Sequence, residues 1–400
     1  MSRNQSQLGT YPNHWELAVF DTVAELKHGY QFRTHDFTES GIKVFKITQI
    51  KGDGTIDISN CDFIDKPRLN DFKKFIIQEG DILMALSGAT IGKIARFKSK
   101  ETVLQNYRVG NFLTKNNGVL NKDYFYYFLT TEYTYQQILA NQTQSAQENV
   151  GKEDIHKMYI FLPPLSEQQS IASVLSSLDD KIDLLHRQNK TLEQMAETLF
   201  RQWFVEEAKD DWEEKPLDEI AEYLNGLALQ KFPAIPGKST LPAIKIREMN
   251  QGITDATDIV SAEIPEKYIV NDGDILFSWS GSLDVIIWSG GMGALNQHLF
   301  KVSSNTYPKW LIYFATRQFL PEFRDIANDK ATTMGHIQRI HLTQSNIKLP
   351  NKKIIEQYDT VMSSLFEKIV HNKLQVRSIE KLRNTLLPKL MNGTIRVINQ

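Results

Sequence analysis

Residues 162–203 read LPPLSEQQSIASVLSSLDDKIDLLHRQNKTLEQMAETLFRQW and hold the clearest structural signal in the chain. After the Pro163-Pro164 stop, seam positions follow one another from Ile171 to Trp203 at alternating steps of four and three residues. An average period of about 3.5 residues is typical of a coiled-coil seam. One helix cannot bury such a seam alone, so the sequence predicts a long helix that packs on a second helix.

A second stretch with the same steps runs from Tyr358 to Leu390. Each helix would be about 50–60 Å long at 1.5 Å per residue. The economical arrangement packs the two helices antiparallel on each other, and the alternative is two unrelated amphipathic helices on separate cores. The predicted helix-packing residues are Leu175, Leu178, Ile182, Leu185, Asn189, Leu192 and Leu199 in the first helix, and Met362, Leu365, Ile369, Asn372, Ile379 and Leu386 in the second.

Asn189 and Asn372 interrupt the two seams at positions where apolar residues are expected. A single buried Asn lowers the stability of a coiled coil but fixes its register. If the helices are antiparallel about a pseudo-twofold axis, we expect Asn189 to lie level with Asn372. Further along, we expect Pro388 to kink or end the second helix, Gly393 to cap it, and residues 394–398 to form a short final strand.

The helices belong to an internal repeat that extends over the whole chain. Gly80–Leu83 recurs as Gly273–Leu276, and Ser176–Leu178 recurs as Ser363–Leu365, with further matches in the same order between them. A period this long is not that of a solenoid, whose repeats have about 20–50 residues. The pattern predicts a duplicated domain plus connector, and chance similarity of short apolar strings is the alternative.

Each copy begins with a β-rich, aromatic part. Strand-like runs at Ile42–Ile47, Asp81–Leu86 and Ile244–Ile246 are separated from their neighbours by Gly, Asn and Asp. Short helices are expected at Lys122–Ala140 and Pro308–Ile326. The predicted class is α+β, with two globular β-rich domains separated by two long antiparallel coiled-coil helices in a pseudo-twofold repeat. The predicted boundaries are 1–162 for the first domain, 163–207 for the first helix, 208–350 for the second domain, and 351–400 for the second helix and the C-terminal strand.

The composition limits the classes of function that the chain can have. The 400 residues carry 46 Lys and Arg against 48 Asp and Glu, a formal net charge of -2, which argues against coating nucleic acid by bulk charge but leaves room for a local basic groove. The single cysteine, Cys61, excludes an intramolecular disulfide and a cysteine-based zinc module, and fits a reducing compartment. Neither a signal-peptide core nor an apolar run of about 18 residues is present, so we expect a cytoplasmic protein without a membrane partner.

The string Ser87–Ile94 follows a predicted strand and looks like a phosphate-binding loop. The nucleotide-binding pattern needs four residues between its glycines and a Ser or Thr after its Lys. Here three residues separate Gly88 from Gly92, and an Ile follows the Lys. The second copy, Ser280–Val285, lacks both the second Gly and the Lys. Two interpretations stay open, namely a glycine loop whose backbone amides approach a phosphodiester and a plain tight turn.

Motifs for catalysis and for metal binding are missing. His336 and His341 are five residues apart, which does not suit two ligands on one helix face, and there is no HExxH. A Gly-x-Ser-x-Gly elbow, a dinucleotide fingerprint, a paired-carboxylate signature and an Asn- or Asp-Pro-Pro-aromatic tetrapeptide of amino-methyltransferases are also absent. The sequence therefore predicts no catalytic residue and no metal ligand, although dispersed catalytic residues would leave no motif.

Polar loops with interleaved aromatics remain as candidate binding elements in both copies. Amide side chains can read adenine bidentately in the major groove, and the alternative is that these loops are merely solvated. The candidate DNA-contacting residues of the first copy are Ser87, Gly88, Thr90, Gly92, Lys93, Arg96, Gln105, Asn106, Tyr107, Gln144, Gln147 and Asn149. Those of the second copy are Ser280, Gly281, Asn296, Gln297, His298, Thr332, Thr333, His336, Gln338 and Arg339.

Taken together, these strings resemble the specificity subunit of type I restriction–modification systems over nearly the whole chain. Leu162–Gln169 looks like that family's start of the first spacer helix, and Leu386–Gly393 with Ile395–Val397 looks like its C-terminal signature. Gly80–Leu83 and Ser87–Gly92 are similar to a recurrent string of its target-recognition domains. The second copy departs from the pattern, because its glycine loop lacks equivalents of Gly92 and Lys93, and Leu349–Lys352 replaces the Pro-Pro-Leu start of the helix.

The resemblance implies a non-catalytic subunit in which each target-recognition domain reads one half of an asymmetric, bipartite double-stranded DNA sequence. The antiparallel helices would set the gap between the halves. It also implies two methyltransferase subunits, which carry S-adenosylmethionine and the chemistry, and a motor-nuclease subunit that can join them. No cofactor is expected on this chain. The rival interpretation is a coiled-coil scaffold that docks two protein partners without DNA contact. The DNA target and the methylated base stay open.

Overall fold

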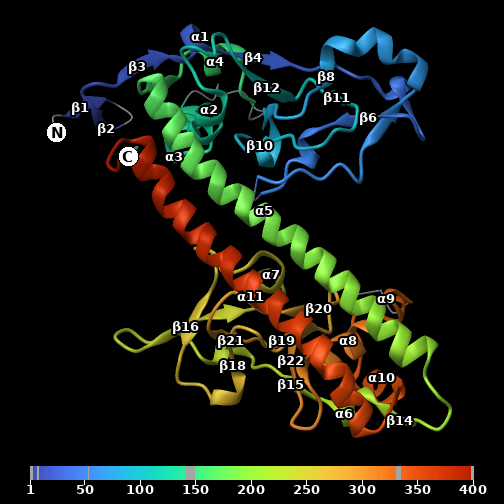
Figure 1. The fold of residues 1–400 in the computed structure, drawn as a ribbon. Helices are drawn as coiled ribbons and strands as arrows, with labels where there is room; N and C mark the ends of the chain where they lie inside the picture. Colours follow the sequence, from blue (N-terminus) through green and yellow to red (C-terminus); the bar gives the residue numbers. More distant parts are fainter. Residues whose placement is uncertain (1–2, 7–8, 53, 141–148, 330–334, 398–400) are drawn as a thin grey trace. The chain divides into compact units, whose positions relative to one another are not determined.

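The computed structural model describes residues 3–6, 9–52, 54–140, 149–329 and 335–397. The chain forms two compact units, which are residues 1–180 with residues 381–400, and residues 181–380. Two long helices, α5 (Leu165–Arg201) and α11 (Lys352–Met391), each contribute one end to the first unit and the other end to the second (Figure 1). The predicted α+β class, with a β-rich part in each repeat and two long helices, is confirmed.

The described residues of the first unit form two main sheets. One has the antiparallel order β10-β9-β12-β4, and the other has the order β5-β7-β6-β11-β8, in which β11 runs parallel to β6. A hairpin, β1–β2, and a pair, β13–β3, stand outside them. The strands are β1 (Arg3–Ser6), β2 (Gly9–Pro12), β3 (Glu16–Val19), β4 (Ala24–His28), β5 (Phe37–Thr38), β6 (Ile42–Phe45), β7 (Asp62–Ile64), β8 (Ile76–Ile77), β9 (Ile82–Ala85), β10 (Ile94–Arg96), β11 (Val103–Gln105), β12 (Val109–Thr114) and β13 (Tyr159–Leu162).

The second unit repeats this topology. Its order β15-β22-β19-β20 corresponds to β4-β12-β9-β10, and its order β17-β16-β21-β18 again contains one parallel pair, β16–β21. The pair β14–β23 corresponds to β3–β13. The strands are β14 (Glu213–Pro216), β15 (Glu222–Asn225), β16 (Thr240–Ile244), β17 (Ile259–Ser261), β18 (Ile269–Val270), β19 (Ile275–Ser278), β20 (Asp284–Ile287), β21 (Gly293–Leu295), β22 (Leu299–Ser303) and β23 (Asn346–Leu349).

Each of the two predicted short-helix stretches divides into two helices, and other short α-helices that were not predicted accompany them. The helices are α1 (Phe20–Val23), α2 (Lys122–Leu129), α3 (Glu132–Ala140) and α4 (Lys152–His156) in the first unit, and α6 (Leu217–Ile220), α7 (Ile246–Gln251), α8 (Lys309–Gln318), α9 (Leu320–Asp329) and α10 (Arg339–Gln344) in the second. The predicted strand at Ile244–Ile246 is wrong beyond Ile244. There the Glu248 carboxylate accepts the Lys245 N–H at 3.2 Å and starts α7 instead.

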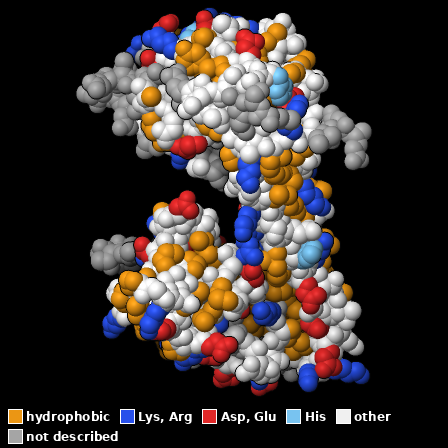
Figure 2. All heavy atoms as spheres, turned by 90° about the vertical axis from the view of Figure 1, so that its left-hand side faces the viewer, with side chains coloured by type: hydrophobic (Ala, Val, Ile, Leu, Met, Phe, Trp, Pro, Cys, Tyr) orange, Lys and Arg blue, Asp and Glu red, His pale blue; other side chains and the backbone are white. Residues whose placement is uncertain are grey.

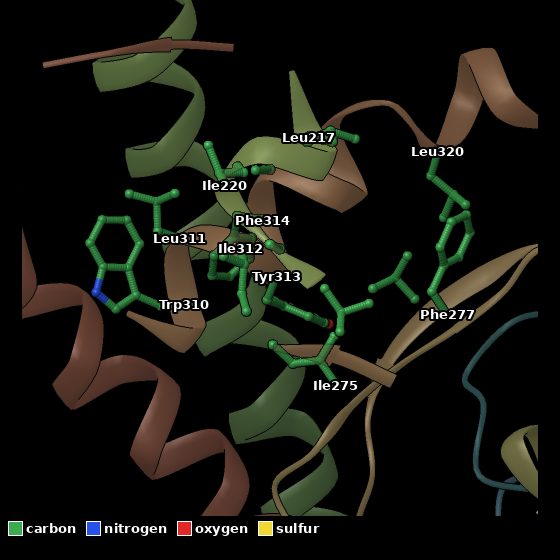
Figure 3. Packing of buried hydrophobic residues seen from close by; sticks show 14 of the residues in the cluster. Leu217, Ile220, Ile275, Phe277, Trp310, Leu311, Ile312, Tyr313, Phe314 and Leu320 are labelled. Carbon is green, nitrogen blue, oxygen red and sulfur yellow. The ribbon is translucent and has the colours of Figure 1, made fainter. Parts of the chain in front are cut away.

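The core of the second unit forms where α6 and α8 pack on β19 (Figure 3). Trp310 to Phe314 are all buried along α8, and they meet Leu217 of α6 and Phe277 of β19 within one apolar cluster. Burying a large apolar side chain contributes about 1.5–3 kcal/mol. Apolar side chains cover most of the circumference of α8, and nearly all of them are buried. This burial explains why the aromatic-rich stretch is stable as a helix.

The two long helices bury their predicted seams within each unit. Leu175, Ile182, Leu185, Asn189, Met362, Ile369 and Asn372 are buried, and Leu178, Leu192, Leu199, Leu365, Ile379 and Leu386 are half-buried. In the second unit, Ile182 and Leu185 pack against Val376, with Ile379 beside them, which requires an antiparallel course. No helix in the described part of the chain is apolar over a length that could span a bilayer.

The two seam asparagines meet inside the second unit. The Asn372 Nδ2 donates a hydrogen bond to the Asn189 Oδ1 at 2.9 Å, which is the contact that the sequence hypothesis requires. The Asn189 Nδ2 in turn donates to the backbone carbonyl of Ile369 at 3.3 Å. Because this contact forms only in one alignment of the helices, a slip of either helix would leave the Asn189 amide oxygen buried without its donor.

The C-terminal end of α11 belongs to the first unit and differs in part from the prediction. The helix passes Pro388 and ends at Met391, because buried Leu390 and Met391 hold its last turn in the core. Gly393 follows with φ +66°, and the Ile395 N–H donates to the Lys389 carbonyl at 3.1 Å, so the predicted glycine cap is confirmed. The predicted strand is wrong for residues 394–397, and Ile398 lies outside the described residues.

The C-terminal segment is held by an ion pair and not by strand pairing. The Arg396 Nε donates to the Glu167 Oε1 at 3.1 Å, near the start of α5. The other carboxylate oxygen lies 3.0 Å from the His14 Nε2 and accepts the Trp15 indole N–H at 3.2 Å. Three segments of the first unit, distant in sequence, are thus joined at one buried carboxylate.

Candidate nucleic-acid interface

The glycine loop of the first unit connects β9 to β10. Gly88 and Gly92 have φ values of +74° and +77°, a conformation that favours glycine. The Ile91 N–H donates to the Gly88 carbonyl at 2.9 Å, and the Gly92 N–H donates to the Ala85 carbonyl at 3.0 Å. Since these amides are already engaged, the geometry favours the tight-turn interpretation. The Ser87 and Thr90 hydroxyls are buried and have no hydrogen-bond partner within the described structure.

The turn between β11 and β12 lies beside this loop. Asn106 is buried, and its Oδ1 accepts the Arg108 N–H at 3.2 Å. The Leu86 N–H donates to the Arg108 carbonyl at 3.0 Å, and this contact joins the turn to the glycine loop. Tyr107 is half-buried and Arg108 is exposed, so the turn presents these two side chains at the surface.

The second unit has the same turn between β21 and β22. Buried Asn296 accepts the His298 N–H on its Oδ1 at 3.3 Å, as Asn106 does for Arg108. Here the loop and the turn also touch through side chains, because the Ser280 Oγ lies 3.2 Å from the His298 Nδ1. Gln297 is half-buried and its Nε2 lies 3.4 Å from the His298 Nε2.

A third segment joins each site through an isolated β-bridge. Ser87 is bridged to Asn149, and Ser280 is bridged to His336. Each unit therefore brings its glycine loop, its turn and the end of a further polar segment to one place. These three elements are far apart in the sequence, but the sheet topology places them together in both copies.

An aromatic cluster completes the site of the second unit. Trp279 is half-buried, and its ring centroid lies 5.8 Å from that of His298 and 6.3 Å from that of His336. Its indole N–H donates to the Asn225 Oδ1 at 3.2 Å. Arg339 approaches from α10, donating to the Tyr223 carbonyl at 3.0 Å. A planar, anchored aromatic surface of this kind can stack on a base or pack against a thymine methyl.

A groove of about 500 Å³ runs beside the same turn in the second unit. Asn296, Gln297 and His298 line it together with apolar Leu229 and Val260 and others. Lys245 and Asp258 also line it and form an ion pair with each other. Since the carboxylate offsets the lysine, the groove offers hydrogen-bonding groups without a net positive charge, which suits a base edge better than a phosphate.

Among the remaining predicted residues, Arg96 and Gln105 make their contacts within the first unit. Arg96 pairs with Asp123 at 2.8 Å, and its guanidinium lies 4.3 Å from the centroid of the Tyr126 ring. The Gln105 Nε2 donates to the backbone carbonyls of Lys27 and Val109 at 2.9 and 2.7 Å, so its amide supports the fold. Lys93 is half-buried at the end of the glycine loop, Gly281 is exposed at φ +66°, and Gln338 is exposed at the start of α10. Gln144, Gln147, Thr332 and Thr333 lie outside the described residues.

Three residues at the sites were not among the predicted contacts. Arg108 was passed over although it follows Tyr107 directly, and it is the exposed member of the turn. Trp279 precedes the Ser-Gly string but lacked an aromatic counterpart in the first copy, where Leu86 stands. Asn225 is far from the loop in sequence, and only the pairing of β15 with β22 brings it close. The internal repeat places Arg108 at the position of His298, which is among the predicted residues.

The charge distribution agrees with the near-neutral composition. On the face drawn in Figure 2, Lys and Arg side chains are interspersed with Asp and Glu over both units. Within the described ranges, no group of three or more His, Cys, Asp or Glu residues could hold a metal ion. Burial raises the pKa of the Cys61 thiol, so this cysteine is neutral near pH 7.

Comparison with known proteins agrees with this architecture. The family model of the type I restriction modification DNA specificity domain matches residues 12–194 and again residues 209–381. The chain belongs to this family. Its two matches coincide with the two copies of the internal repeat. As a specificity subunit of type I restriction–modification systems, it is a non-catalytic component that recognises DNA sequence through two domains.

Individual relatives match over nearly their full length. The MjaIX type I restriction enzyme specificity subunit of Methanocaldococcus jannaschii is 25% identical, covering 98% of this chain and 96% of that protein. The HindI specificity subunit of Haemophilus influenzae is 21% identical, covering 84% and 91%. A crystal structure of the type I S subunit from M. genitalium superposes with a TM-score of 0.57 at 15% identity, covering 94% and 96%, and thus shares the fold.

Proposed function

We propose that this chain selects the DNA target of a type I restriction–modification complex, with one half of a bipartite, asymmetric double-stranded sequence read by each unit. The observation that carries the proposal is the duplicated site. In both units a glycine loop, an Asn-based turn and a bridged polar segment converge, while the exposed side chains differ. Two sites with one frame and different contacts are suited to reading two different half-sites.

The proposal gives the long helices two roles. They separate the half-sites by a fixed gap, and they dock two methyltransferase subunits, which bind S-adenosylmethionine and carry the chemistry on a flipped base. A motor-nuclease subunit can join this assembly. Exposed apolar side chains on the helices support docking. In the second unit, Leu184, Met195 and Val361 are 39%, 50% and 47% exposed on the two helices, and we assign them to this docking surface.

Docking can be tested without disturbing the seam. Met195→Glu and Val361→Glu place a charge on an exposed position, so the chain should keep its own stability and lose affinity for the methyltransferase subunit. Thr191→Glu is a control on the same helix, because Thr191 is exposed but not apolar. Co-purification at several salt concentrations measures the effect. Unchanged assembly of both apolar-to-Glu variants would remove these residues from the docking surface.

The recognition proposal is tested on the chain together with its methyltransferase subunit. Sequencing of methylated sites defines the motif, and duplexes with one half-site randomised are then compared in binding. We expect salt-dependent binding in which randomising either half lowers affinity by a factor of about 10³ or more, as for specific over non-specific sites. Binding that ignores the sequence, or no binding, would favour a protein scaffold without DNA contact.

A further inference from the structure

The internal repeat provides two versions of the site in one chain. The two versions share the backbone of the turn, which we call the frame, and differ in their exposed side chains. In the first unit the Asn106 N–H donates to the Phe45 carbonyl at 3.0 Å, and the Tyr107 N–H donates to the Tyr30 carbonyl at 2.9 Å. In the second unit, Asn296 and Gln297 make the equivalent bonds to the Ile244 and Leu227 carbonyls, at 3.1 and 2.8 Å. The backbone of the turn is therefore the same in both units.

Two glycines make this frame rigid. A Cβ atom on Gly29 would lie 2.2 Å from the Gln105 carbonyl oxygen, and one on Gly226 would lie 2.2 Å from the Asn296 carbonyl oxygen. Contacts that short exclude any side chain at either position. Each turn is thus pressed against a glycine from a neighbouring segment, and its position relative to the sheet is fixed in the same way.

On this shared frame, the exposed position differs between the units. Arg108 stands in the first unit where His298 stands in the second. The Arg108 Nε donates to the Tyr107 hydroxyl at 2.7 Å, and the guanidinium lies 5.4 Å from the centroid of that ring. The aromatic neighbour therefore holds the guanidinium plane in a defined orientation, which an exposed arginine otherwise lacks.

The histidine is held differently. The His298 Nδ1 faces the Ser280 hydroxyl, the Nε2 faces the Gln297 amide, and the ring lies against Trp279. An imidazole offers single hydrogen bonds, whereas a guanidinium offers a fork of two parallel N–H groups. A fork of this kind matches the O6 and N7 acceptors of guanine in the major groove.

We propose that the turn position occupied by Arg108 and His298 selects a base in each half-site, and that Arg108 selects guanine in the half read by the first unit. This assignment rests on the proposed function, since it presupposes that the units read DNA. Tyr107 is a positioning residue, which acts by orienting the guanidinium. Asn106, Asn296, Gly29 and Gly226 maintain the frame.

The experiment uses the full chain assembled with its methyltransferase subunit and reads the methylated motif by sequencing. Arg108→His and Arg108→Lys should relax or change one base position in one half-site and leave the other half and the gap unchanged. His298→Arg should change only the opposite half-site. In binding assays, Arg108→Lys should lose about 10- to 100-fold of its discrimination for guanine at that position. Lys157→Ala removes an exposed charge of the first unit as a control and should change nothing.

The unchanged half-site serves as an internal test of folding and assembly in every variant. The inference is overturned if Arg108→His and Arg108→Lys leave the motif intact at normal methylation levels, or if they weaken binding equally for all bases, as a phosphate contact would. It is also overturned if Arg108 and His298 variants alter the same half-site. Failure of the proposed function looks different, because the wild-type assembly would then show no bipartite motif at all.

Discussion

The buried carboxylate of Glu167 connects three segments of the first unit. Its carboxylate is contacted by His14, Trp15 and Arg396, which come from the N-terminal and C-terminal segments of the first unit. Burial acts to raise the pKa of this carboxyl group, but the hydrogen bonds from the three neighbours outweigh it and hold the pKa below its ordinary value of 4.5. The ionised form is therefore the one that the folded unit requires.

The lowered pKa of Glu167 has a consequence for acid stability. A carboxyl group with a lowered pKa stabilises the fold above its ordinary value, and this contribution is lost as the pH falls below about 4.5. We expect Glu167→Gln to cost about 1–3 kcal/mol at neutral pH, as lost hydrogen bonds to a charged group do. The variant should also lose less stability than the wild type between neutral and acid pH.

Urea unfolding of the full chain at a series of pH values measures both effects. Glu39→Gln is a matched control, because Glu39 is exposed in the same unit. Identical pH dependence of the Glu167→Gln variant and the wild type would show that the carboxylate does not stabilise the unit.

At the residue scale, only part of the site could be predicted from the sequence. In the first unit Ser87 is bridged to Asn149, and in the second unit Ser280 is bridged to His336, so each pair of predicted residues lies at one site. Arg96 could not be placed, since its orientation depends on Asp123, which returns to it through a helix 27 residues later. Likewise, nothing local shows that Gln105 donates inward to the Lys27 carbonyl.

At the scale of elements, the long helices were the most predictable feature. A seam period is a local property, so burial of the helix faces and the pairing of Asn189 with Asn372 could be expected before the fold was known. The end of α11 could not be predicted. Pro388 lies in the last turn, and the burial of Leu390 and Met391 in the core outweighs the tendency of a proline to end a helix. Strand order was equally inaccessible, since parallel pairs such as β6–β11 join distant segments.

The asparagine pair should determine helix register more than stability. Asn372→Leu alone leaves the Asn189 amide buried without its partner and should cost about 1–3 kcal/mol. The double variant Asn189→Leu/Asn372→Leu should regain or exceed wild-type stability, because both polar groups are removed together. Thermal unfolding of the single and double variants forms a double-mutant cycle. Additive losses in the double variant would contradict the pairing.

The helices should also set the gap between half-sites. Inserting one heptad after Asn189 and one after Asn372 keeps the seam in register and adds about 10.5 Å to each helix at 1.5 Å per residue. We expect a methylated motif with both half-sites unchanged and a gap several base pairs longer. Sequencing of methylated sites reads this directly. A lengthened protein that assembles and keeps the original gap would rule out the spacing role.

At the scale of the whole molecule, each unit contains a helix segment from another part of the chain. Residues 381–400 belong to the first unit, and the C-terminal part of α5 belongs to the second unit. The repeat and the family resemblance were accessible from the sequence, because ordered short matches survive even where the copies diverge. The identity of the contacts was not, since the exposed side chains differ between the copies, as Arg108 and His298 do.

If each unit reads its own half-site, replacing one β-rich part with a copy of the other must change the methylated motif. The strand pairs β3–β13 and β14–β23 close the two β-rich parts at Glu16 with Leu162 and at Glu213 with Leu349, which defines equivalent boundaries. Residues 213–349 are replaced by a copy of residues 16–162, and the methylated sites of cells carrying this chain with its methyltransferase subunit are sequenced. We expect a motif built from two copies of the first half-site. A motif that keeps the original second half would contradict this expectation.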